Sequence, residues 1–246
     1  MLTDIEQQSL LVWYDAEKRD LPWRQTQDPW HILLSEILLQ QTQVSRGIVF
    51  WERMVRAFPT VESMANASVD TVLKAWEGAG YYSRARRLHA LSQQVMLPAS
   101  EGGFDGRLPS TYTSLLSLPG IGPYTAAAVA SIAFGEPVAC VDGNIRRVMA
   151  RRTADENPGV KAVQSWADAS LVADRPGDWN QALMELGATV CKPRRVACGR
   201  CPIENTCTVK GRAEHFPAAK QQRTKAVRMV AVVEFAEDGH PMLTQR

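Results

Sequence analysis

Residues Leu118 to Asn144 read LPGIGPYTAAAVASIAFGEPVACVDGN, and the rest of the chain is organised around this stretch. Gly120 and Gly122 flank one apolar residue in a tight turn, and Pro123 suits the first position of the following helix, where its missing N–H costs nothing. The run before the turn can form a short helix. The glycines leave backbone N–H groups free at a helix N-terminus, an arrangement that binds phosphate. The alternative is a tight corner between two packed helices.

The same stretch ends in Val141-Asp142-Gly143-Asn144, which places an aspartate at the start of another helix, predicted over 143–152. Capping is the commonest role of an aspartate in that position. Hydrogen bonds from helix N–H groups stabilise the charged carboxylate. We therefore expect Asp142 to stay ionised.

Length and composition allow one large domain or two small ones, because the 246 residues are 45% hydrophobic and 22% charged. The net charge of +2 neither requires nor excludes nucleic acid as a partner. No segment resembles a signal peptide or approaches the length of a membrane span. We expect a cytoplasmic protein without membrane contact.

A second informative segment begins at Asp28-Pro29, a cap followed by proline in the first turn of a helix. Apolar residues cover both faces of this helix, which predicts that it is buried: Trp30, Ile32, Leu33, Leu34, Ile37, Leu38 and Leu39. Glu36 lies among them, and a buried carboxylate is costly unless it is paired or protonated. Its pKa should therefore be raised, as in a general acid that works near neutral pH. A purely structural buried glutamate is the alternative.

Glu36 and Asp142 would thus be two carboxyl groups in opposite protonation states. This division is typical of glycosidic bond cleavage, in which one group protonates the leaving group and the other stabilises a sugar cation. A third carboxyl, Glu185, lies in an amphipathic helix predicted from Trp179 to end at Gly187.

Two further segments suit contact with DNA. Gln40-Gln41-Thr42-Gln43 is either a solvated turn or a surface that reads base edges. Gly78 to Arg87 presents Tyr81 and Tyr82 before three arginines in the first turn of a helix, where cations need an anionic partner. Aromatic rings beside arginines suit base stacking and phosphate contacts. For Tyr82 we favour packing in the core.

Four of the five cysteines form a cluster with the spacing Cys191-x6-Cys198-x2-Cys201-x5-Cys207, which predicts a metal site. Zinc sites usually show two close pairs, whereas only Cys198 and Cys201 are close here, so the spacing favours a [4Fe–4S] cluster over zinc. The segment 191–228 holds ten Lys and Arg against two Asp and Glu, which favours a DNA-facing surface. Cys140, in an apolar run, is expected in the core.

Seven features carry a resemblance to adenine DNA glycosylases of the MutY type, within the endonuclease III helix-hairpin-helix superfamily: LPWR, SEILLQQTQV, GAGYYSRARRL, LPGIGPYTA, VDGNIRRV, NQALMELGA and the four spaced cysteines. The resemblance implies an all-α, two-lobed helix-hairpin-helix DNA glycosylase fold. A six-helix barrel lobe would span 24–135, and an iron–sulfur cluster lobe would combine 1–23 with 136–216. Residues 217–246 would be a basic linker and the first strands, at 228–235 and 242–246, of an incomplete Nudix-like domain.

The implied activity is DNA base-excision repair, in which a monofunctional glycosylase hydrolyses the N-glycosidic bond of adenine mispaired with 8-oxoguanine or guanine. The adenine would be flipped out of double-stranded DNA before the carboxyl groups reach it. The resemblance further implies one [4Fe–4S] cluster, a monomer, and action on bacterial nucleoid DNA.

The resemblance also assigns roles to individual residues. Glu36 would protonate adenine, Asp142 would stabilise the sugar cation, and Asn144 would assist it. Tyr124 joins this catalytic set and stands where bifunctional relatives carry a lysine, so no amine is present to form a Schiff base. Substrate and DNA binding would fall to Arg24, Gln41, Thr42, Tyr81, Gly120, Gly122 and Glu185, and metal binding to Cys191, Cys198, Cys201 and Cys207. A bifunctional endonuclease III-like glycosylase/lyase and a non-catalytic iron–sulfur DNA-binding protein remain alternatives.

Overall fold

The computed structural model describes residues 1–218, 235, 236 and 240. Its α-helices are α1 (Asp4–Glu17), α2 (Pro29–Leu38), α3 (Val44–Ala57), α4 (Val61–Ala65), α5 (Val69–Ala75), α6 (Tyr82–Met96), α7 (Tyr112–Leu116), α8 (Pro123–Phe134), α9 (Gly143–Thr153), α10 (Val160–Ala169) and α11 (Pro176–Thr189). Short 3-10 helices are η1 (Pro22–Arg24), η2 (Ala99–Glu101), η3 (Cys198–Arg200), η4 (Glu204–Thr206) and η5 (Ala213–His215). The all-α class is confirmed. The expected strands at 228–235 and 242–246 lie, apart from Phe235, outside the described residues.

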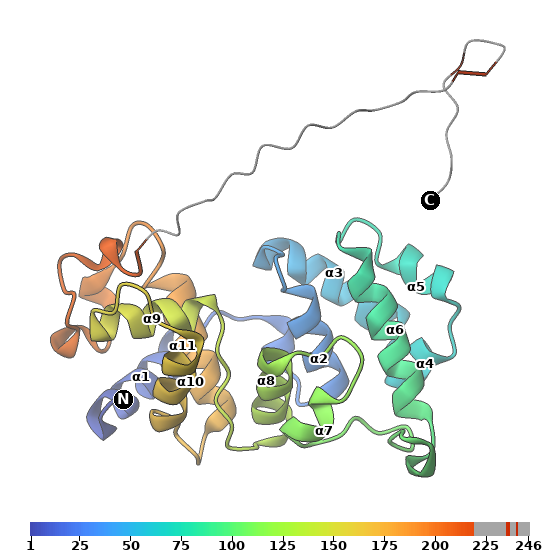
Figure 1. Ribbon diagram of the computed structural model, residues 1–246, viewed down its shortest axis with the longest axis horizontal. Helices are drawn as coiled ribbons and strands as arrows, with labels where there is room; N and C mark the ends of the chain where they lie inside the picture. The colour runs from blue at the N-terminus through green and yellow to red at the C-terminus, as the bar shows by residue number, and fades with distance from the viewer. Residues whose placement is uncertain (219–234, 237–239, 241–246) are drawn as a thin grey trace.

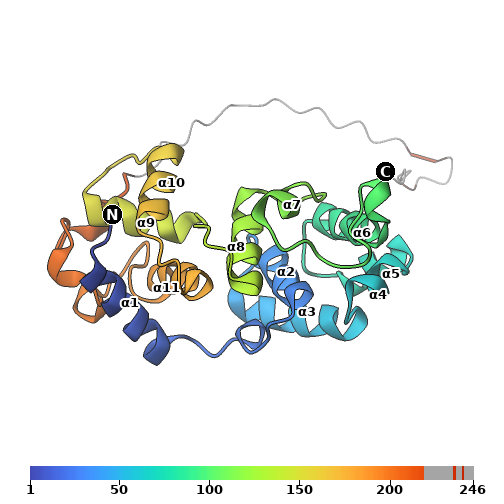
Figure 2. The same ribbon diagram turned by 90° about the horizontal axis from the view of Figure 1, so that it is seen from below.

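The helices form two groups that lie side by side in both ribbon views (Figures 1 and 2). One group contains α2 to α8, and the other contains α1 and α9 to α11. Each group has its own buried core. The first core includes Trp30, Leu34 and Trp76, and the second includes Leu10, Trp179 and Leu183.

Local sequence signals explain where the helices that carry the site begin. The Asp28 carboxylate accepts a hydrogen bond from the Trp30 N–H at 2.8 Å, and Pro29 follows at the first helical position of α2. Thr3 and Glu6 form a reciprocal capping box at the start of α1. The Asp28 cap of α2 is as predicted.

Helix α8 forms the wall between the two cores. Ala126 and Val129 belong to the first core, while Ala127 and Ala128 belong to the second. Helix α11 approaches α8 closely at Gly177, where a Cβ atom would lie 2.7 Å from the Ser131 carbonyl oxygen. The absence of a side chain at Gly177 thus lets α11, which carries pocket residues, pack directly against α8.

The prediction that the helix carrying Glu185 ends at Gly187 is wrong, because α11 continues to Thr189. Gly187 instead permits a close contact with the start of α9. A Cβ atom at this position would lie 2.5 Å from the Cβ of Asn144. The glycine therefore holds Asn144 against α11.

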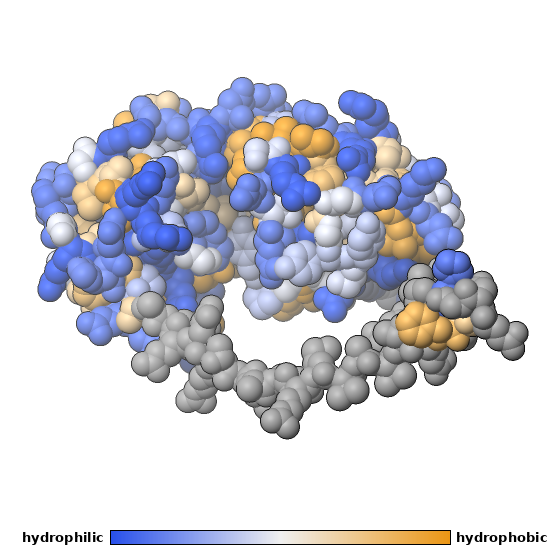
Figure 3. Space-filling view, turned by 90° about the horizontal axis from the view of Figure 1, so that it is seen from above, coloured by the Kyte–Doolittle hydropathy of each residue, from blue (hydrophilic) through white to orange (hydrophobic). Residues whose placement is uncertain are grey.

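The surface seen from above in Figure 3 is mostly hydrophilic, with apolar side chains in smaller patches. Within the described ranges, none of the helices has both the length and the apolar character needed to cross a membrane.

Candidate active site

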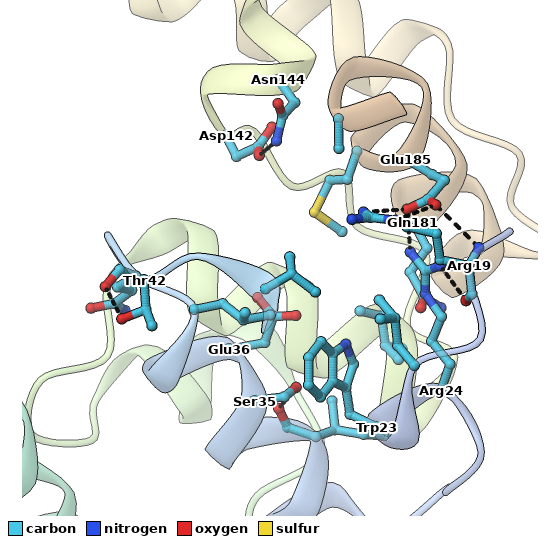
Figure 4. A pocket seen from close by; sticks show the side chains of 18 of the residues that line it. Arg19, Trp23, Arg24, Ser35, Glu36, Thr42, Asp142, Asn144, Gln181 and Glu185 are labelled. Carbon is cyan, nitrogen blue, oxygen red and sulfur yellow. Dashed lines mark hydrogen bonds and ion pairs between the residues drawn. The ribbon is translucent and has the colours of Figure 1, made fainter. Parts of the chain in front are cut away.

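A pocket of about 350 Å³ lies where the two groups of helices meet. Figure 4 shows Glu36 on α2 on one side of the pocket and Asp142 with Asn144 at the start of α9 on the other. The lining includes seven of the residues that the sequence singled out: Arg24, Glu36, Thr42, Tyr124, Asp142, Asn144 and Glu185. Helices far apart in sequence thus bring the expected catalytic residues together.

Glu36 is only 8% exposed, near the C-terminal end of α2. Burial raises the pKa of its carboxyl to about 7, and the nearby Asp142 charge adds to the rise. A hydrogen bond from the Tyr124 hydroxyl to Oε2, at 2.8 Å, and the charge of Arg24 act in the opposite direction. The predicted rise in pKa is confirmed.

Asp142 caps α9 as predicted. Its Oδ1 accepts from the Ile145 N–H at 2.8 Å, and its Oδ2 accepts from the Asn144 side-chain amide at 2.6 Å. Burial outweighs these bonds and raises the pKa of Asp142, and the expectation that Asp142 stays ionised remains a prediction. The hydrogen bonds still favour the charged form and limit the rise.

Asn144 is oriented by Arg147, a residue that the sequence analysis did not single out. An Arg147 amino group donates to Asn144 Oδ1 at 2.8 Å, so the amide N–H₂ of Asn144 faces Asp142. Arg147 also donates to the carbonyl oxygens of Gly187 and Cys191, at 2.8 Å each. The helper residue is therefore anchored to α11 and to the segment after it.

Tyr124 lies between two pocket residues. Its hydroxyl reaches Glu36 Oε2 and also Met184 Sδ, at 3.2 Å. Met184 was not expected from the sequence, because a methionine on an amphipathic helix is normally core. None of the described residues that line the pocket is a lysine.

Glu185 is 1% exposed and pairs with two arginines that follow α1. Arg19 binds both of its carboxylate oxygens at 2.7 Å, and Arg24 binds Oε2 at 2.9 Å (Figure 4). Burial alone would raise the pKa of Glu185, but these hydrogen bonds outweigh it and lower the pKa. Arg19 is 166 residues away in sequence, and no local signal predicted the pairing.

The segments expected to contact DNA present exposed side chains. Tyr81 is 61% exposed, and Gln41 is exposed at the end of the turn after α2. The prediction that Tyr82 packs in the core is wrong, because it is 45% exposed at the first position of α6. The expectation that Arg84 needs an anionic partner is also wrong, because its guanidinium donates to backbone carbonyl groups.

The helical hairpin formed by α7, the turn at Gly120 and Gly122, and α8 has the predicted geometry. Gly120 adopts φ 80°, in the left-handed region that favours glycine, and Gly122 precedes α8 without a side-chain cap. Phosphate binding by this turn stays a prediction.

The four clustered cysteines line one small cavity together with Arg151. Arg151 is 2% exposed and donates to Cys191 Sγ at 3.3 Å and to the Lys192 carbonyl oxygen at 2.7 Å. Within the described residues, no group of three or more His, Cys, Asp or Glu side chains is arranged to hold a metal ion. The fifth cysteine, Cys140, is buried in the second core as predicted.

Comparisons with known proteins point to one family. A family model described as "HhH-GPD superfamily base excision DNA repair protein" matches residues 34–167. The human adenine DNA glycosylase is 44% identical over 220 residues, which are 84% of this chain and 39% of that protein. The adenine DNA glycosylase of Mycolicibacterium smegmatis is 42% identical over 221 residues, covering 87% of this chain and 72% of that protein. The chain thus spans about two fifths of the length of the human relative.

Two solved structures are similar. A thermostable thymine-DNA glycosylase has a TM-score of 0.75 and 30% identity, with 82% of this chain and 93% of that chain covered. A trapped endonuclease III–DNA covalent intermediate has a TM-score of 0.70 and 20% identity, with 87% and 98% covered. The second likeness concerns the fold alone.

Proposed function

Because this chain belongs to the HhH-GPD superfamily of base excision DNA repair proteins, we propose that it is a monofunctional adenine DNA glycosylase. Its substrate would be double-stranded DNA that contains adenine opposite 8-oxoguanine or guanine. The observation that carries the proposal is Glu36, a buried carboxyl with a pKa of about 7 in a pocket that also holds Asp142. A carboxyl group that keeps its proton near neutral pH can protonate a leaving base.

Glu36 would act as the general acid. Burial keeps its carboxyl protonated near neutral pH, and the hydrogen bond from Tyr124 fixes the position of Oε2. Transfer of this proton to adenine would weaken the bond between base and sugar. The sugar would then develop positive charge at its anomeric carbon.

Asp142 would stabilise that positive charge in its ionised form. Its capping bond and its bond from Asn144 support a fixed orientation, and Arg147 in turn fixes Asn144. A preoriented carboxylate in a site shielded from water stabilises a cation more strongly than it would in bulk solvent. Water would complete the hydrolysis.

The adenine must leave the duplex to reach this pocket. Gln41 and Tyr81, both exposed, are suited to contact the base left behind, and Thr42 lies at the pocket itself. Arg24 and Glu185 form part of the pocket wall and would shape the space for adenine. The glycines of the α7–α8 turn would bind the DNA backbone through their N–H groups.

We further propose that Cys191, Cys198, Cys201 and Cys207 hold one [4Fe–4S] cluster. The four thiols share a cavity, and Arg151 is a buried cation that pairs with no carboxylate in the described part of the chain. An anionic cluster would supply its counter-charge and would join the segments after α11. Iron and sulfide analysis of anaerobically purified protein tests this, and stoichiometric zinc without iron would refute it.

We propose a barrel lobe over 24–135 and a cluster lobe from 1–23 and 136–216. The two cores support this division in outline, with Leu21 and Trp23 in the first core and Ala127 and Ala128 of α8 in the second. We propose that the protein acts as a monomer on DNA in the cytoplasm.

Incubation with a duplex that holds one adenine opposite 8-oxoguanine, followed by heating in alkali, tests the activity. Wild type should give strand breaks only after alkali, and Glu36→Gln should lose at least about 10²-fold in rate while it still binds DNA. Breaks before alkali, together with borohydride trapping, would instead identify a glycosylase/lyase. Binding without base release by wild type would identify a non-catalytic DNA-binding protein.

A further inference from the structure

Arg84, in the first turn of α6, connects the two exposed segments that carry Gln41 and Tyr81. One amino group of its guanidinium donates to the carbonyl oxygens of Ile37 at 2.7 Å, Leu38 at 3.2 Å and Gln40 at 2.7 Å. The other donates to those of Ala79 at 3.1 Å and Gly80 at 3.4 Å. The last carbonyl groups of a helix lack partners within the helix, so Arg84 satisfies the end of α2 and the 79–80 turn at once.

The guanidinium also contacts two aromatic rings. Its central carbon lies 5.4 Å from the ring centroid of Trp76 and 5.3 Å from that of Tyr81. Trp76 is fully buried, whereas Tyr81 is exposed. Arg84 therefore links an exposed ring to the rigid core of its lobe.

Gln41 and Tyr81 share an unusual backbone conformation. Their φ angles are 58° and 48°, in the left-handed region that residues other than glycine rarely adopt. Such conformations persist only where the surroundings hold them. Arg84 binds the carbonyl oxygen of the residue directly before each one, Gln40 and Gly80.

The contacts of Arg84 indicate a geometric role rather than charge pairing. Among the described residues, no carboxylate forms an ion pair with Arg84. Its planar group has the fixed arrangement of donors that two separate sets of carbonyl groups require.

We propose that Arg84 is a positioning residue that holds Gln41 and Tyr81 as one preformed wedge, which enters DNA beside the flipped adenine. This inference rests on the proposed function. A wedge that is already ordered loses less conformational freedom on binding, so more binding free energy remains to unstack the base.

The test compares Arg84→Gln with Arg56→Gln, a change of an exposed arginine in the last turn of α3, outside the segments expected to contact DNA. Both are made in the Glu36→Gln background, so that DNA is bound without base release. The duplex carries 2-aminopurine next to the adenine:8-oxoguanine pair, and its fluorescence at saturating protein reports unstacking. Arg84→Gln should lower the fluorescence rise severalfold, and Arg56→Gln should leave it unchanged. An unchanged rise in Arg84→Gln would overturn the proposal.

A double-mutant cycle with Tyr81→Ala separates positioning from general stability. In the active enzyme, Arg84→Gln should slow single-turnover base release roughly 10- to 100-fold. If Arg84 acts through the wedge, adding Arg84→Gln to Tyr81→Ala should cause little further loss of the base-release rate. Fully additive losses would contradict the proposal, as would full rescue by Arg84→Lys, which keeps the charge without the planar fork.

Failure of the proposed function gives a different pattern. A wild-type protein that never releases adenine, yet unstacks the duplex in an Arg84-dependent way, would refute the glycosylase and support the wedge.

Discussion

Replacement of Glu36 by glutamine should make folding stability less dependent on pH. Burial raises the pKa of this carboxyl from its ordinary value of 4.5 to about 7, so the folded protein binds the proton more tightly than the unfolded chain. Its contribution to stability is therefore fully present below 4.5 and is lost as the pH rises through about 7. The difference in pKa corresponds to about 3 kcal/mol, which is a large fraction of the stability of a typical domain.

The assay is urea unfolding of wild type and Glu36→Gln at intervals between pH 4.5 and pH 8.5. The free energy of unfolding of wild type should fall by about 3 kcal/mol relative to the variant across this range. Glu52→Gln, a change of an exposed glutamate on α3, is the matched control and should follow wild type. Parallel curves for wild type and Glu36→Gln would refute the assignment of the raised pKa to Glu36.

Three further substitutions test the site. Tyr124→Phe removes a hydrogen bond to the charged form of Glu36, so the pH above which base release declines should move upward, as measured by single-turnover rates. Gly187→Ala forces a Cβ atom against Asn144 and should lower the free energy of unfolding by about 1–3 kcal/mol, with slower base release. Glu185→Gln leaves two arginines without their buried partner and should cost about 3–5 kcal/mol in urea unfolding.

Each of these three predictions has a control substitution and an outcome that would contradict it. Tyr82→Phe, at an exposed tyrosine, should leave the pH profile in place, and an equal shift would argue against the Tyr124 contact. Gly159→Ala has no atom within 4 Å of the new Cβ, so a loss as large as that of Gly187→Ala would argue against the clash. Asp15→Asn breaks an exposed ion pair worth about 1 kcal/mol or less, and a similar cost for Glu185→Gln would show that burial of the pair adds little.

Much of the fold and site could be predicted because the informative residues are close in sequence. Asp28 with Pro29 marked the start of α2, and a single carboxyl among apolar residues marked Glu36 as buried. Asp142 before a glycine marked the start of α9. In each case, the residues mark a group that would cost free energy if it were left without a partner, either an unsatisfied helix N–H group or a buried charge. The folded structure must offset that cost locally.

Contacts between distant segments could not be predicted in the same way. The pairing of Arg19 with Glu185 and the closeness of Gly187 to Asn144 depend on how whole helices pack. The rise in the pKa of Asp142 was missed because a capping motif reveals hydrogen bonds and not the depth of burial. Arg84 was interpreted by its position at a helix N-terminus, although its partners are carbonyl groups of other segments.

The most direct test of the central claim is the rate of adenine release as a function of pH, measured under single-turnover conditions with the A:8-oxoguanine duplex. If protonated Glu36 is the acid, the rate should fall about tenfold for each pH unit above a value near 7, because the protonated fraction declines in that proportion. A rate that stays constant between pH 6 and pH 9, or rises, would contradict the account.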